Sequence, residues 1–141
     1  MSQSLIWLHI LEGGGHITAL LDRVNPGGIV ILPGLGDLAK QAHARGIRVF
    51  GRQPGTEADR WYSATELAQA FGDALPYLEA LATPNEPNVE TEEQVKECNA
   101  FDLQFIVDCH AMGKKACIRN WGDGRPGGTW MEIGDLLWYY L

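Results

Sequence analysis

Short apolar runs alternate along the chain with stretches in which apolar residues recur every three or four positions. Apolar runs typical of buried strands occupy residues 5–11, 28–32 and 47–50. A fourth strand is expected near residues 82–83, and a fifth is expected at 115–121. The helical spacing covers four stretches between these strands and one more at the end, namely 16–24, 38–44, 63–81, 91–112 and 131–141.

Local signals set several helix boundaries. Ser63 and Glu66 have the spacing of a capping box, in which the serine oxygen accepts a helix amide and the glutamate reaches back. Pro76 is expected to kink or restart the helix that Ser63 opens. The longest helix begins at Thr91, and its apolar positions form one stripe: Val95, Cys98, Phe101, Phe105, Cys109 and Met112.

Strands that alternate with helices predict a parallel sheet with right-handed crossovers. The pattern therefore predicts an α/β fold with about five parallel βα units. At 141 residues, one domain is expected over 1–141. That length is short of the roughly 250 residues of a complete (β/α)8 barrel, so the barrel would be incomplete.

Composition and charge narrow the function classes. The chain is 45% apolar with a net charge of −7, which fits a globular protein and disfavours nucleic acid as a partner. Residues 84–110 carry −6 of that charge, seven acidic residues against Lys96, and predict a solvated helix face. No apolar stretch is long enough to span a bilayer, and no signal peptide is visible, so we expect no membrane partner and a cytoplasmic location.

The three cysteines suit the same compartment. Their spacing matches no metal site. Cys98 and Cys109 would lie about 16 Å apart along one helix face, too far for a disulfide, so buried free thiols are expected. No cluster of histidine, cysteine and aspartate has zinc spacing, and neither a metal nor a cofactor is expected.

Polar and aromatic residues follow the expected strands. In a parallel sheet the carboxyl ends of the strands meet at one edge, where ligands bind. Residues of these types at that edge would recognise a sugar. Amides and charged groups would bind the hydroxyls of the sugar, and an indole ring would pack on its C–H surface. The candidates, in chain order, are His16, Arg52, Asn85, Glu86, Asn120 and Trp121.

The segment Leu81-Ala82-Thr83-Pro84-Asn85-Glu86-Pro87-Asn88 resembles the end of the fourth strand in clan A glycoside hydrolases. Those enzymes are (β/α)8 barrels with an Asn-Glu pair at this point. The resemblance implies that Glu86 is the general acid/base and that Asn85 holds a sugar hydroxyl. It also implies that Arg52 lies at the active-site end of the third strand and that 115–121 is the fifth strand.

The resemblance also implies a second glutamate, the nucleophile, near the end of a seventh strand. Retaining hydrolysis needs two carboxyl groups about 5 Å apart. The sequence ends within the expected fifth unit, so that position is expected to be missing. Carbohydrate is the expected ligand, and a second copy or a complementary barrel half is the expected partner. A non-catalytic carbohydrate-binding or structural fragment is the alternative.

A second pattern favours a different ligand. Gly34-Leu35-Gly36-Asp37-Leu38-Ala39 is a G-x-G-x-x-A sequence after an apolar strand and before a helix. Helix-start amides hold a pyrophosphate in that setting, and Arg52 could then meet the 2′-phosphate of NADP. Asp37 opposes this interpretation because it places a negative charge beside the phosphates.

Overall fold

The computed structural model describes residues 6–54, 60–83 and 91–118. These residues form five parallel strands: β1 (Trp7–Ile10), β2 (Gly28–Ile31), β3 (Arg48–Arg52), β4 (Ala80–Ala82) and β5 (Lys115–Cys117). The strands lie side by side in the order of the sequence, β1-β2-β3-β4-β5. The chain is therefore α/β, with the regular βα rhythm that the apolar pattern predicts.

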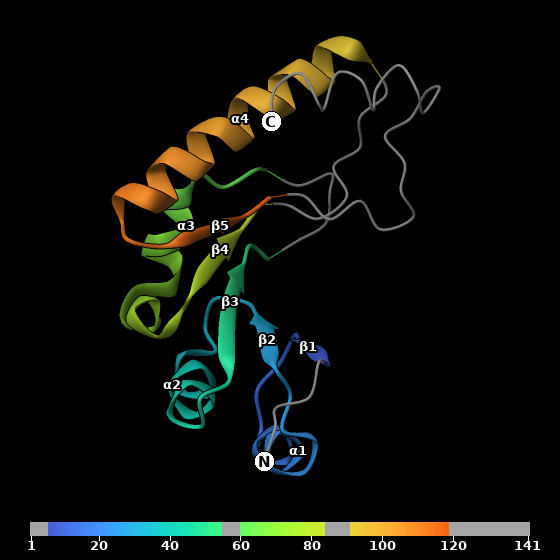
Figure 1. Ribbon diagram of the computed structural model, residues 1–141, viewed down its shortest axis with the longest axis vertical. Helices are drawn as coiled ribbons and strands as arrows, with labels where there is room; N and C mark the ends of the chain where they lie inside the picture. The colour runs from blue at the N-terminus through green and yellow to red at the C-terminus, as the bar shows by residue number, and fades with distance from the viewer. Residues whose placement is uncertain (1–5, 55–59, 84–90, 119–141) are drawn as a thin grey trace.

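Four α-helices connect the strands: α1 (Gly15–Val24), α2 (Gly36–Ala44), α3 (Ala64–Phe71) and α4 (Glu92–Ala111). In Figure 1, α3 and α4 lie on one side of β4 and β5, and α2 lies beside β3. The parallel strands follow one another in sequence order, and crossovers between such strands have the same hand. The connecting helices therefore lie on one face of the sheet. None of the helices in the described ranges is long and apolar enough to cross a bilayer.

The core lies between the sheet and these helices. Alternate strand residues point into it and are almost fully buried, for example Ile29, Ile31, Val49 and Leu81. The register pairs Ile31 with Gly51 and Gly51 with Leu81, so one continuous row of small and aliphatic groups faces the helices. Gly51 is required in that row, because a Cβ there would lie 2.6 Å from the Phe71 ring.

The opposite face of the sheet is more open. The alternate residues Trp7, Val30, Phe50 and Arg52 are exposed or half-buried. The Trp7 ring lies over Gly28, where a Cβ would come within 2.3 Å of it, and its centroid is 4.6 Å from that of Phe50. This open face (the alternate strand residues that point away from the helices) is the one that a closed barrel would enclose.

The predicted capping box at Ser63 forms, and a second one, which was not predicted, forms at Thr91, where the sequence places the start of the longest helix. The Ser63 side chain accepts from the amide of Glu66, the Thr91 side chain accepts from the amide of Gln94, and both reciprocal bonds are present. The stripe of α4 is buried at Val95, Cys98, Phe105 and Cys109, as the 3.6-residue period requires.

The structure corrects the helix that begins after Ser63. It ends at Phe71 and does not continue through Pro76 to residue 81, because Gly72 adopts φ +50, a positive-φ conformation that glycine tolerates. A 3-10 turn, η1 (Gly72–Tyr77), follows and contains Pro76. The prediction placed the interruption of the helix at Pro76, whereas Gly72 is the residue that ends it.

Candidate functional site

All five strands end at the same edge of the sheet, which we call the carboxyl edge. Two of the six predicted site residues, His16 and Arg52, lie among the described residues. Asn85, Glu86, Asn120 and Trp121 fall within 84–90 and 119–141, outside the described residues, as does the predicted helix at 131–141. The strand that precedes Asn85 and Glu86 is nevertheless described, and it is the fourth in spatial order.

Arg52 is the last residue of β3 and is half-buried. Its register partner is Ala82, the last residue of β4. Because side chains alternate along a strand, Arg52 leaves the sheet on the same face as Phe50, opposite the buried Val49. The guanidinium therefore belongs to the open face at the carboxyl edge, beside the strand that leads to Glu86.

His16 lies apart from Arg52. It is the second residue of α1 and is exposed, with its ring against the backbone of Gly14. The strand before it, β1, is separated from β3 by β2, which amounts to two strand spacings, or about 10 Å. The two candidates thus share the carboxyl edge but belong to different parts of it.

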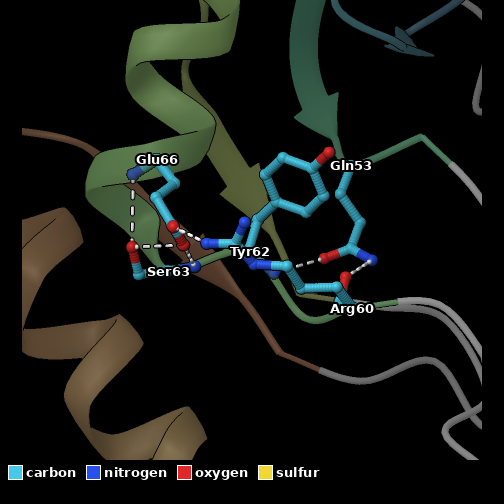
Figure 2. Close-up of polar contacts among 5 residues, drawn as sticks. All are labelled: Gln53, Arg60, Tyr62, Ser63 and Glu66. Atoms are coloured by element: carbon cyan, nitrogen blue, oxygen red, sulfur yellow. Dashed lines mark hydrogen bonds and ion pairs between the residues drawn. The ribbon is translucent and has the colours of Figure 1, made fainter.

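The chain after Arg52 is fixed by a buried amide. Gln53 is 3% exposed, donates from Nε2 to the carbonyl oxygen of Arg60 at 3.2 Å, and accepts at Oε1 from the Tyr62 amide at 3.0 Å. Figure 2 shows this side chain reaching from the end of β3 to the segment that enters α3. One glutamine therefore anchors both sides of the loop that follows the third strand.

A second set of polar contacts holds the start of α3. The Glu66 carboxylate accepts from the Ser63 amide at 2.9 Å and from its hydroxyl at 3.1 Å, and it is also paired with the Arg60 guanidinium (Figure 2). The bonds from Ser63, with the nearby charge of Arg60, lower the pKa of Glu66. Glu66 is therefore a fixed anion with a structural task, and it is a poor candidate for a proton donor.

Aromatic rings pack behind this loop. Trp61 meets the edge of Phe101 at a centroid distance of 5.2 Å, and Phe101 lies 6.0 Å from Phe105. Trp61 is half-buried and follows the third strand, on the segment fixed by Gln53. Trp61 is not among the residues predicted for the site. Its position in the sequence, shortly after Arg52, could have indicated an aromatic group at this edge.

Two polar residues of α4 are buried, and one of them contradicts a prediction. Asp102 is 6% exposed, although the acidic residues of this helix are predicted to form a solvated face, and Asn99 is 8% exposed. They are three residues apart and so lie on the same side of the helix, between Cys98 and Phe105 of the buried stripe. Residues of the apolar stripe lie on both sides of them in the sequence, and this was the signal that could have predicted their burial.

The glycine motif lies at the turn that the sequence predicts. Gly34, with φ +91, sits between β2 and α2, and Gly36 is the first residue of α2. Dinucleotides bind doubly wound sheets where the strand order reverses, and the described sheet runs from β1 to β5 without a reversal. The strand order therefore disfavours the dinucleotide interpretation.

Within the described ranges, no group of three or more histidine, cysteine, aspartate or glutamate side chains could hold a metal ion. Cys98 and Cys109 are buried free thiols, as expected, and Cys117 is exposed. Comparison of the chain with models of protein families, with curated proteins and with solved structures gives no match.

Proposed function

We propose that this chain forms the first five βα units of a (β/α)8-barrel domain that resembles the clan A glycoside hydrolases and binds carbohydrate at its carboxyl edge. The observation that carries the proposal is the position of β4. It is the fourth strand in both sequence and space, and Asn85-Glu86 follows its last residue, Ala82, directly after Thr83-Pro84. Ligands of barrel folds bind at this end of the strands.

In the proposed site, Glu86 is the general acid/base and Asn85 holds a neighbouring hydroxyl. Arg52 supports this arrangement because it ends the strand adjacent to β4, on the open face. Asn120 and Trp121 would follow β5 at the same edge and contact the sugar through an amide and an indole face. His16 would lie at the far side of the edge, beyond β2, and contact a more distant part of the ligand.

A retaining mechanism also needs a nucleophilic carboxylate about 5 Å from Glu86. The resemblance puts that group after a seventh strand, and the described sheet has five. We therefore assign carbohydrate binding to these residues themselves. Glycoside hydrolysis belongs to an assembly or a longer chain that supplies the later strands.

The sheet itself favours such an assembly. In the described sheet β1 and β5 each have one neighbour, so each leaves a row of backbone groups available for pairing. Apolar side chains flank the β1 edge, with Ile6 55%, Trp7 36% and Leu11 66% exposed. The proposed partner is a second copy of this chain or a complementary barrel half. Light scattering that finds only monomers across the micromolar range would exclude the second copy.

Titration calorimetry with a panel of oligosaccharides tests the binding proposal, and an aryl-glycoside panel tests hydrolysis. We expect binding that Arg52→Ala weakens, and any turnover should disappear in Glu86→Gln. Binding without turnover supports the non-catalytic alternative. Absence of binding to every oligosaccharide, by a chain that circular dichroism shows to be folded, would exclude both.

A further inference from the structure

A pocket of about 310 Å³ lies at the carboxyl edge between the first two βα units. Its wall includes the glycine-containing segments 13–15 and 34–35, which follow β1 and β2. Residues from the first two turns of α1 and α2 complete the wall: Thr18, Asp37, Leu38 and Gln41. The volume is at the lower end of the range of about 300–1,000 Å³ that small-molecule sites occupy.

A hydrogen bond fixes the amide of Gln41, one of the residues that line this pocket. The Thr18 hydroxyl donates to Oε1 of Gln41 at 2.9 Å. Because Oε1 accepts that bond, the amide carries its two N–H donors on the opposite side, on Nε2. The hydroxyl oxygen of Thr18 keeps its acceptor capacity, and Asp37 adds a carboxylate, so the pocket wall offers both a donor and acceptors.

The charge of the side chains that line the pocket favours a neutral ligand over an anion. Among the lining residues that the structure describes, none is a lysine, arginine or histidine, and the charged one is Asp37. A phosphate would face that carboxylate without a cationic side chain to offset the repulsion. A neutral hydroxyl has no such conflict, because it can donate to the Asp37 carboxylate and accept from Nε2 of Gln41.

We propose that this pocket binds a small neutral polyhydroxylated molecule of about the size of a monosaccharide or cyclitol. The assignment rests on the pocket, the oriented amide and the absence of cations from its wall. It is independent of Glu86, which follows β4, two strands beyond β2. The proposal for this pocket therefore goes beyond the function proposed above, and either proposal can be wrong while the other holds.

The binding test uses D-glucose and myo-inositol as probes, with inorganic phosphate and NADP⁺ as the charged comparisons. Chemical shifts of the 15N-labelled chain are followed during titration. We expect shifts at the amides of 13–18 and 34–41, with a Kd on the order of 1 mM for one of the neutral probes. Shifts in this region with phosphate or NADP⁺ alone, or with none of the probes, would overturn the proposal.

Substitution of Gly15 tests the pocket directly. A Cβ at this lining residue would have no atom within 4 Å, so Gly15→Leu can fill the space without a clash and should abolish the shifts. Gly36→Ala is the matched control, since Gly36 also begins a helix, lies outside the wall, and its Cβ would meet Ala74 at an ordinary 3.5 Å. Equal binding by both variants would contradict the proposal.

Two further variants address the chemistry. Gln41→Met keeps the length of the side chain and removes the N–H donors, and it should raise the Kd about tenfold. If Gly15→Leu does not fold, unchanged binding by Gln41→Met overturns the proposal on its own. Glu86→Gln separates the two sites, because it should weaken oligosaccharide binding and leave unchanged the shifts that D-glucose or myo-inositol causes at 13–18.

Discussion

The Nε atom of Arg48 lies 2.6 Å from Oε2 of Glu79, across the amino ends of two neighbouring strands. The second carboxylate oxygen accepts from the other arm of the guanidinium at 2.9 Å and from Nζ of Lys115 at 2.5 Å. The same guanidinium stacks on the rings of Trp7 and Phe50, at 5.3 and 5.5 Å from their centroids. This network ties β3, β4 and β5 at the edge opposite to the proposed sites.

The network makes stability depend on pH. The hydrogen bonds from Arg48 and Lys115 lower the pKa of Glu79 to about 2, below its ordinary value near 4.5. The stabilisation is therefore complete above about pH 4.5 and is lost as the pH falls through 2. Because both cations are largely exposed, we expect Glu79→Gln to lower the free energy of unfolding by only about 1 kcal/mol at pH 7.

Urea unfolding at pH 7 and pH 3 measures this effect. The difference between the wild type and Glu79→Gln should shrink at the lower pH. Glu97→Gln, an exposed position on α4, is the control and should show little difference at either pH. An equal loss for Glu79→Gln at both values would show that the ion pairs do not cause it.

The packing of Gly51 predicts a large effect from one methyl group. In Gly51→Ala the new Cβ would lie 2.6 Å from Phe71 and 2.7 Å from Leu78, both in the core. Overpacking of this kind costs about 1–3 kcal/mol, so the melting temperature should fall by several degrees. Gly36→Ala, which makes an ordinary contact, should leave the melting temperature within about a degree of the wild type. Equal melting temperatures for the two variants would contradict this account.

The capping box of α3 gives a third prediction. Ser63→Ala removes the acceptor for the Glu66 amide and should lower the free energy of unfolding by about 1 kcal/mol. Ser63→Gly should lose only a few tenths, because water then reaches the freed amide. Chemical denaturation of the two variants measures the difference, and an equal loss in both would argue against the cap.

The thiols should react in two classes. Burial, together with the charge of Asp108, raises the pKa of the Cys109 thiol to about 11, and Cys98 is fully buried, whereas Cys117 is exposed. Desolvation raises the pKa of the Cys117 thiol as well, so the difference in labelling comes from the access of the reagent. An aromatic disulfide reagent at pH 8 should therefore label one thiol quickly and the other two only in denaturant. Cys117→Ser should abolish the fast phase. Fast labelling of two thiols in the wild type would contradict the burial of α4.

Helices and strands could be predicted from the sequence where the residues that set their boundaries lie a few positions apart. The Ser63–Glu66 pair predicted one helix start correctly, because a capping box involves residues three positions apart, and the segment that begins at Thr91 predicted another. Gly72 shows the opposite case. Its positive-φ conformation ends α3 four residues before Pro76, and nothing in the nearby apolar spacing indicated which of the two residues would act first.

Some features of the candidate site could likewise be predicted from local sequence, and others could not. His16 and Arg52, the two predicted site residues that the structure describes, could be assigned to one edge from the alternation of strands and helices, since parallel strands share their carboxyl ends. The separation of His16 from Arg52 depends on the strand order. The anchoring of the loop after β3 depends on hydrogen bonds that Gln53 makes with Arg60 and Tyr62, which belong to no recognised sequence motif. The pocket beside Thr18 and Gln41 joins residues 23 positions apart, which no local pattern relates.

By itself, the sequence determined the βα rhythm, the buried stripes and the placement of Asn85-Glu86 after a fourth strand, because propensity and periodicity act over a few residues. Only the tertiary structure decided the spatial order of the strands, the burial of Asn99 and Asp102, and the pocket between the first two units. Those properties depend on which distant segments pack together. Packing is a cooperative balance of burial and chain entropy over the whole domain, and it leaves no signature in a short stretch of sequence.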